Sequence, residues 1–239
     1  MSNTAVRVFR YSADVELAFG DTPRTADYAL QVLSRVVAHA VELGKVAGNP
    51  CEGIKHLYKN DRSEIIWAES DIAHIKKTCS VEIANAIDLA SHTGLRLGDL
   101  IRLSWSHISD DAIVLTTSKS KHRREAIIPM YGELRKILSS IPKRATTVLT
   151  SSRLRPWTAD GFGSSFNKAK IDAKISDLDL HFNDLRGTAA TKFYIAGFTM
   201  REIAETLAWE EQSVEKIIRR YVGRTAAIKA RIKKLEARE

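Results

Sequence analysis

The sequence contains few cysteines and no long apolar run, and each absence excludes a class of protein. Its two cysteines, Cys51 and Cys79, lack a metal-ligand spacing and are too few for a disulfide framework. They fit a reducing cytoplasm, which is where we expect this protein. No apolar stretch approaches the ~20 residues that span a bilayer. Charged residues interrupt the first twenty positions, so we also expect no secretory signal.

What the sequence does contain is positive charge on an otherwise ordinary globular composition. The formal net charge is +8 and the isoelectric point is about 9.5, with 44% hydrophobic and 28% charged residues. An excess of this sign favours a polyanionic partner, although it does not identify one. A chain of 239 residues can form one large domain or two smaller ones.

The apolar spacing divides the chain into a short helical segment and a longer mixed one. Residues 25–43 carry apolar side chains at helical spacing, and Gly44 with the stretch 48–50 ends that pattern. Residues 53–62 form a polar connector with several basic side chains. We therefore predict a helical segment over 1–60 and a separate domain over 63–239.

The longer part reads as helices, then a short sheet, then helices. Two β-rich runs, 112–117 and 125–129, flank a basic heptapeptide, which is the signature of a hairpin. Helices and one further strand are predicted at 70–78, 82–93, 99–105, 131–138, 146–150 (the strand), 158–173, 199–208, 213–221 and 224–239. Ser70, Thr199 and Ser213 are the predicted caps, and Thr199 with Glu202 forms a capping box. The predicted fold class is mainly α with a small antiparallel β-sheet (α+β).

Five residues follow one another along the chain in an order that suits the cleavage of a phosphodiester. Arg96 lies in Thr-Gly-Leu-Arg, with an acidic residue three positions on at Asp99. The other four follow along the chain: Lys119, Arg186, Trp209 and Tyr221. A protein that breaks a DNA strand without a metal ion or a water nucleophile needs such a set: two arginines, a lysine and a tyrosine late in the chain. The order, and the sequence around each residue, resembles the tyrosine recombinase (phage integrase) family over roughly 63–239.

The resemblance implies a role for each of these side chains. Arg96 and Arg186 would stabilise the extra negative charge on the phosphorus oxygens, since a guanidinium offers two parallel hydrogen bonds and stays protonated. Trp209, where the family commonly has histidine, would donate its indole N–H, although a core tryptophan fits the position equally well. Tyr221 would attack and form a 3′-phosphotyrosyl bond. No ATP, metal or other cofactor is implied.

The basic hairpin is where the resemblance places the general acid. Lys119 would protonate the leaving 5′ oxygen, but Lys121 lies two positions on, points to the same side of an extended strand, and competes for the role. Lys121, Arg123 and Arg124 are the predicted DNA-binding residues, through phosphate contacts that carry no sequence information.

One position departs from the family pattern. Asn183 stands where the family usually has the histidine of His-x-x-Arg, three residues before Arg186. An amide can orient a phosphate but cannot act as a base near neutral pH, and Asn183 could equally cap the helix that begins there. His181, two residues upstream, could take the histidine's place or be structural.

The resemblance further implies double-stranded DNA as the partner and a homo-oligomer, a tetramer, on that DNA. Family members have a fuller helical clamp before the catalytic domain, so we expect the segment 1–60 to be a truncated, partial core-binding segment. Two other functions stay open: a DNA-binding remnant without turnover, and strand cleavage of the type IB topoisomerase kind without synapsis. Matches spread over more than a hundred residues argue against a simple helix-turn-helix regulator.

Overall fold

The computed structural model describes residues 22–58, 65–118 and 124–221, without the side chains of Arg220 and Tyr221. Backbone contacts divide the chain into two units, Met1–Asp61 and Arg62–Glu239, which are taken separately below. Of the helices in the described ranges, none combines the length and the apolar character that crossing a membrane requires. The predicted tail helix over 224–239 lies outside the described residues.

In the smaller unit, one long helix is lined by the chain that returns along it. The helix α2 (Pro23–Glu42) begins with proline at its first position, where the missing N–H costs nothing. Asn49 Nδ2 donates to the Ser34 carbonyl at 3.1 Å. At the other end, the Asp27 carboxylate accepts the N–H groups of Leu57 and Tyr58, both at 2.9 Å. The helix predicted over 25–43 is thus confirmed.

One face of α2 carries exposed apolar side chains. Tyr28, Val32 and Val36 follow one another at a spacing of four residues and are 66%, 49% and 62% exposed. This spacing places them in one stripe along the helix. Within residues 22–58, the returning chain therefore covers a different face.

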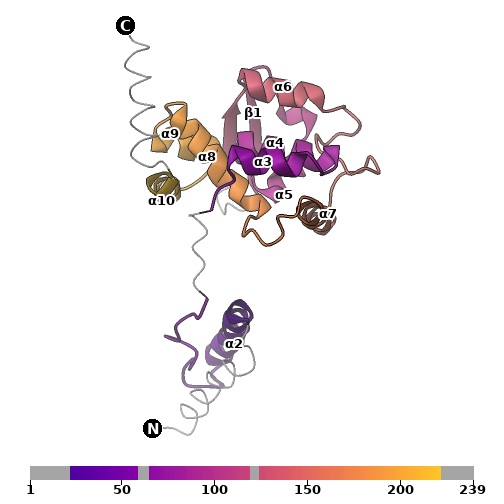
Figure 1. Ribbon diagram of the computed structural model, residues 1–239. Helices are drawn as coiled ribbons and strands as arrows, with labels where there is room; N and C mark the ends of the chain where they lie inside the picture. Colours follow the sequence, from indigo (N-terminus) through magenta and orange to yellow (C-terminus); the bar gives the residue numbers. More distant parts are fainter. Residues whose placement is uncertain (1–21, 59–64, 119–123, 222–239) are drawn as a thin grey trace. The chain divides into compact units, whose positions relative to one another are not determined.

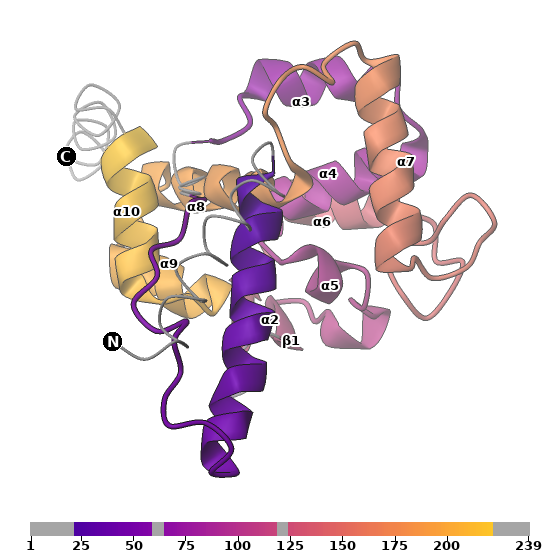
Figure 2. The same ribbon diagram turned by 90° about the horizontal axis from the view of Figure 1, so that it is seen from below.

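The larger unit is mainly helical, and two strands in its described residues form one hairpin (Figures 1 and 2). Its elements are, in chain order, α3 (Glu69–Lys76), α4 (Val81–Thr93), α5 (Leu97–Leu100), the 3₁₀ turn η2 (Trp105–His107), β1 (Ala112–Thr116), β2 (Glu125–Pro129), α6 (Gly132–Ser140), α7 (Ala159–Asp172), the 3₁₀ turn η3 (Phe182–Asp184), α8 (Leu185–Ile195), α9 (Met200–Leu207) and α10 (Glu211–Tyr221). The predicted fold class is confirmed.

Helix α4 is the centre of this unit and contacts α3, α5, α6, α7 and α8. Ser80 caps its start by accepting the Ile83 N–H, and Gly94 ends it in the left-handed conformation at φ 61°. Ile83, Ile87 and Leu89 are among its buried side chains. In both views α9 and α10 lie at one end of the unit and α7 at the other (Figures 1 and 2).

The hairpin alternates between core and solvent, as its sequence predicts. Ile113 and Ile128 are register partners and fully buried, whereas the next pair, Val114 and Ile127, is exposed. Strand β2 packs against α9, which brings the hairpin to the end of the unit that holds α9 and α10.

An aromatic cluster fixes the start of α8. Phe182 packs edge-on against Phe162 and Phe166, with ring centroids 4.7 and 5.3 Å apart. The buried Trp67 donates its backbone N–H to the Thr188 hydroxyl at 3.0 Å and its indole N–H to the His181 carbonyl at 2.9 Å. These bonds hold α8 against the segment that enters the unit.

Two predicted elements in this unit are wrong. The helix predicted over 99–105 stops at Leu100, because the Ser104 hydroxyl caps the following 3₁₀ turn by accepting the Ser106 N–H. The strand predicted over 146–150 makes isolated bridges at Thr147 and Thr150 instead of a ladder. Its β-rich composition reflects burial, since Val148 and Leu149 are each 1% exposed.

The caps are partly confirmed. Thr199 accepts the Glu202 N–H at 3.2 Å while the Glu202 carboxylate accepts the Thr199 N–H, as the capping box predicts. Ser70 and Ser213 are wrong as caps, because α3 and α10 begin one and two residues earlier, at Glu69 and Glu211. Acidic residues in the first turn of a helix stabilise it through the helix dipole, so the neighbouring sequence does not identify the capping residue by itself.

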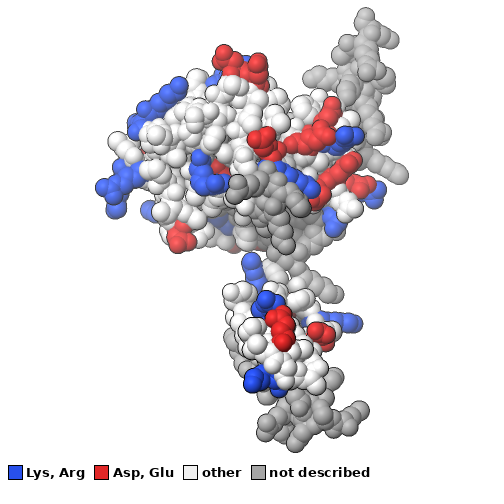
Figure 3. Space-filling model, turned by 180° about the vertical axis from the view of Figure 1, so that it is seen from behind, with Lys and Arg blue, Asp and Glu red and all other residues white. Residues whose placement is uncertain are grey.

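On the face of the larger unit seen in Figure 3, basic and acidic side chains are interspersed among uncharged ones.

Candidate active site

Two predicted arginines meet where α4 ends and α8 begins. Arg96 precedes α5 in extended backbone conformation, two residues after Gly94. Arg186 is the second residue of α8, and its Nη1 donates to the Gly94 carbonyl at 2.6 Å. The left-handed turn at Gly94 therefore presents both Arg96 and the acceptor that orients Arg186.

The Arg186 guanidinium lies in a strongly cationic environment. Burial, and then the charge of Arg96, lower the pKa of Arg186 well below its ordinary value, and Asp99 partly opposes this. An arginine still remains protonated at neutral pH. Two cations held close together with one carboxylate leave surplus positive charge, which an anion would stabilise.

Trp209 packs against one of these two cations, Arg186. Its ring stacks on the Arg186 guanidinium, with Cζ 4.4 Å from the ring centroid. The residue follows Ala208, which ends α9 in the left-handed conformation at φ 52°. The Trp209 Nε1 atom is buried and has no hydrogen-bond partner within the described ranges. A buried donor without an acceptor is costly unless a ligand supplies one.

Asp99 ties the hairpin to the same turn. The carboxylate is fully buried, and Oδ1 accepts the backbone N–H and the hydroxyl of Ser118, both at 2.9 Å, and Arg102 Nη2 at 2.8 Å. Ser118 immediately precedes Lys119 in the sequence. Lys119, Lys121 and Arg123 themselves lie outside the described residues.

On the other side of the hairpin loop, just before β2, Arg124 contacts the connection between α9 and α10. Its Nη2 lies 2.7 Å from Glu210 Oε1, and its Nη1 donates to the Trp209 carbonyl at 3.3 Å. The predicted phosphate contact of Arg124 stays a prediction.

Asn183 is not the cap of α8. It lies exposed in the 3₁₀ turn η3, and Asp184 is the residue that precedes α8. The capping prediction fails because the 3₁₀ turn contains Asn183 itself, so the helix begins later, at Leu185. His181 is exposed, with Nε2 3.5 Å from Asp179 Oδ1. Within the described ranges, no hydrogen bond or ion pair joins either side chain to Arg96 or Arg186.

Tyr221 is the last residue of α10, and its side chain lies outside the described part. The helix is anchored by Val214 and Ile218, which are 0% and 2% exposed. It packs against α8 and α9, the helices that position Arg186 and Trp209. The packing thus relates the helix that ends in the predicted nucleophile to the helix that begins with Arg186.

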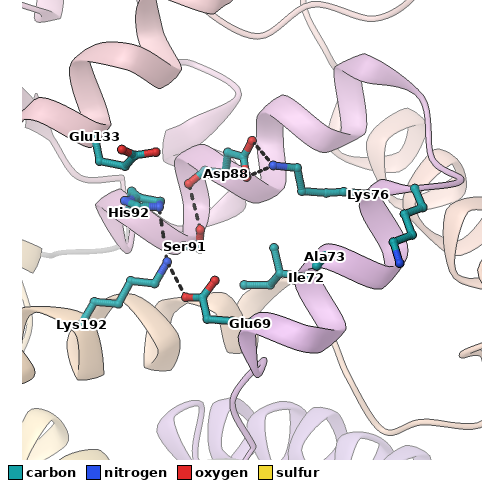
Figure 4. Close-up of a pocket in the computed structure, with 10 residues that line it drawn as sticks. Glu69, Ile72, Ala73, Lys76, Asp88, Ser91, His92, Glu133 and Lys192 are labelled. Atoms are coloured by element: carbon teal, nitrogen blue, oxygen red, sulfur yellow. Dashed lines mark hydrogen bonds and ion pairs between the residues drawn. The ribbon is translucent and has the colours of Figure 1, made fainter.

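Sequence reasoning missed a polar cluster that joins α4 and α8 (Figure 4). His92, in the last turn of α4, lies 3.3 Å from Lys192 Nζ through Nε2 and 2.6 Å from the Tyr131 hydroxyl through Nδ1. Lys192 also pairs with Glu69 Oε1 at 3.0 Å. His92, Lys192 and Glu69 line a cavity of about 430 Å³. The lysine donates, so Nε2 accepts and the His92 proton lies on Nδ1.

Neutral His92 should give the fold a measurable pH dependence. Burial, and then the charge of Lys192, lower the pKa of His92 from its ordinary 6.5. The unfolded chain therefore binds this proton more tightly, and the free energy of unfolding should fall as pH drops below about 6.5. Glutamine keeps both hydrogen bonds without titrating. In urea titrations across this range, His92→Gln should lose less stability than wild type, and an unchanged slope would contradict the neutral assignment.

Comparison with known proteins identifies the family of this chain. The model of the phage integrase family matches residues 55–226. A shufflon-specific DNA recombinase of Escherichia coli is 28% identical over 190 residues, which are 77% of this chain and 47% of that protein. The chain thus spans about half the length of this curated relative.

Two solved structures show the same fold at low sequence identity. A lambda integrase dimer bound to a COC′ core site superposes with a TM-score of 0.68 at 19% identity, covering 86% of this chain and 64% of that one. A lambda integrase tetramer bound to a Holliday junction gives 0.65 at 19% identity, covering 83% and 64%. The family match, the fold and the paired arginines lead to one conclusion: the chain belongs to the phage integrase family of tyrosine recombinases.

Proposed function

We propose that this chain is a site-specific DNA recombinase of the integrase type, which cleaves and rejoins DNA through a 3′-phosphotyrosyl intermediate. The observation that carries the proposal is the set of cationic and donor groups around Arg186. Arg96, Arg186 and the buried Nε1 of Trp209, which has no hydrogen-bond partner among the described residues, together suit a phosphate with developing negative charge. Family membership supports the same reaction class.

In the proposed reaction, the Tyr221 hydroxyl loses its proton to solvent, because the surrounding cations favour the phenolate. The phenolate oxygen then attacks phosphorus while the bond to the 5′ oxygen breaks. Arg96 and Arg186 bind the non-bridging oxygens, and Trp209 donates its indole N–H to one of them. Lys119, or Lys121 in its place, protonates the leaving 5′ oxygen. Asn183 orients the phosphate without taking a proton. The phosphotyrosyl bond conserves energy, so a 5′-hydroxyl of another strand can reverse the attack and no cofactor is required.

The proposed partner is double-stranded DNA. The related recombinase acts on DNA by its name, and structures of similar fold hold DNA as a dimer and as a tetramer. We extend both features to this chain, with a homotetramer on DNA. Lys121 and Arg123 would contact backbone phosphates beside the general acid. Within this proposal, residues 63–239 form the catalytic domain and residues 1–60 belong to a helical segment that contacts the DNA.

A library of nicked duplexes, randomised around the nick, tests the proposal without knowledge of the site. Cleavage near a nick releases a short strand that cannot religate, so the protein stays joined to DNA. Wild type should give a denaturant-resistant adduct, and Tyr221→Phe should give none. Tyr28→Phe is the matched control, because that tyrosine is 66% exposed in the smaller unit; it should retain the adduct.

Each other outcome identifies a different function. DNA binding without any adduct in wild type would show a remnant without turnover. Relaxation of supercoiled plasmid without recombinant product would show topoisomerase-like cleavage. An adduct that persists in Tyr221→Phe would contradict the assignment of the nucleophile.

A further inference from the structure

Arg124 is fixed at the end of the hairpin and extends away from it. Its carbonyl accepts the N–H of Thr117 at 2.9 Å and the Thr117 hydroxyl at 3.0 Å, and Thr117 is buried. These two hydrogen bonds fix the backbone of Arg124, so the position from which its side chain extends is defined. The guanidinium uses one nitrogen for the Glu210 carboxylate and another for the Trp209 carbonyl.

Those two residues are the whole link between α9 and α10. Helix α9 ends at its cap, Ala208, and α10 begins at Glu211. The Glu210 carbonyl accepts the N–H groups of Ser213 and Val214 at 2.9 and 3.3 Å, so Glu210 also begins the first turn of α10. Arg124 therefore contacts both residues of the link, one through a hydrogen bond and the other through an ion pair.

The link matters because it carries the Trp209 ring on Arg186. Catalytic groups must be held to within a fraction of an ångström, and a small displacement can lower a rate considerably. Glu210 also places a carboxylate on the residue that follows Trp209, whose indole we propose for phosphate binding. Unpaired, this carboxylate would repel a phosphate, and the Arg124 cation neutralises it.

We propose that Arg124 is a positioning residue, which holds Trp209 over Arg186 by binding the Trp209 carbonyl and the Glu210 carboxylate together. This inference rests on the proposed function. It gives Arg124 a role within the protein in place of the phosphate contact expected from the sequence. Lysine could satisfy one of the two acceptors but lacks the fork that reaches both.

The solvent exposure of the Arg124–Glu210 ion pair determines how much its loss should change the stability of the protein. The two side chains are 41% and 69% exposed, and ion pairs at such positions contribute little to global stability. The free energy of unfolding should therefore hardly change on substitution. The effect should fall instead on the local order of the link and on the rate of cleavage.

A double-mutant cycle tests the inference. The variants are Arg124→Gln, Glu210→Gln and the two combined, with cleavage followed in single turnover on a nicked duplex recovered from the randomised library. Each single variant should slow cleavage about fivefold, and the double variant no further. Duplex affinity, measured against salt concentration, should keep its slope. Arg124→Lys should recover part of the rate.

Lys168→Gln is the matched control. It also removes one cation from an exposed ion pair, with Asp172 on α7 at 3.0 Å, and should leave the rate unchanged. A phosphate contact would give the opposite pattern and overturn the inference. Arg124→Gln would then weaken DNA binding and reduce the salt slope by about one, while Glu210→Gln would leave cleavage unaffected.

Hydrogen exchange in the free protein separates this inference from the proposed function. The amides of Ser213 and Val214 should exchange faster in Arg124→Gln and Glu210→Gln than in wild type and Lys168→Gln. Equal exchange in all four proteins would overturn the inference, even where wild type cleaves DNA. Absence of an adduct in wild type would refute the proposed function, and the exchange result would still decide whether Arg124 holds the link.

Discussion

Arg186→Lys should slow single-turnover cleavage of a nicked duplex by about a thousandfold, or ~4 kcal/mol of barrier. The guanidinium donates to the Gly94 carbonyl at 2.6 Å and stacks on Trp209 while keeping further N–H groups for a ligand. An ammonium has neither the flat face nor the fork, so it cannot hold that carbonyl and two phosphate oxygens together. The folded state should tolerate the change, because burial and Arg96 already disfavour a cation at this position.

Arg201→Lys is the matched control for this substitution. Arg201 lies on the outside of α9, where it pairs with Glu205 at 2.9 Å. Its replacement should leave both the cleavage rate and the melting temperature unchanged. If Arg186→Lys retained more than about a tenth of the wild-type rate, Arg186 would not be the main stabilising group.

Gly94→Ala should lower the free energy of unfolding of the larger unit by about 3 kcal/mol. At φ 61° the residue lies in the left-handed region, which is costly for alanine. The added Cβ would lie 2.7 Å from Leu207 Cδ2 and 3.3 Å from Ala189 Cβ. These atoms belong to α9 and α8, so the substitution would push apart the helices that carry Trp209 and Arg186.

Urea unfolding followed by tryptophan fluorescence measures this loss, since all four tryptophans lie in the larger unit. Gly98→Ala is the control, because Gly98 lies in α5 and has no atom within 4 Å of an added Cβ. It should change stability by less than about 0.5 kcal/mol, or increase it slightly. Equal effects of the two substitutions would show that the close approach at Gly94 is not needed.

The sequence predicted correctly those elements that are determined by residues close together in the chain. The capping box at Thr199 and the alternation of β1 and β2 depend on neighbouring residues, and both are confirmed. The strand predicted over 146–150 failed because burial of Val148 and Leu149 produces the same composition as a strand. The helix predicted over 99–105 failed because the Ser104 hydroxyl offers the backbone another partner.

The sequence predicted which residues lie together better than it predicted the contacts that hold them. Arg96, Arg186 and Trp209 were assigned from the resemblance to integrase motifs, and the structure brings them together, while their chemical roles stay predictions. The Gly94 carbonyl as acceptor, the His92–Lys192 contact and the grip of Arg124 on Glu210 were not predictable. Each joins residues far apart in the chain, and backbone carbonyls or charged side chains at such positions carry no distinguishing pattern.

The chemical identity of the protein–DNA link tests the central claim most directly. Trypsin cuts after Arg220 and Arg224, so Tyr221 falls in a short peptide without a second tyrosine. After nuclease digestion of the adduct, mass spectrometry should find a residual 3′-nucleotide on that peptide, and Arg186→Lys should reduce its yield. A nucleotide on any other residue would contradict the account.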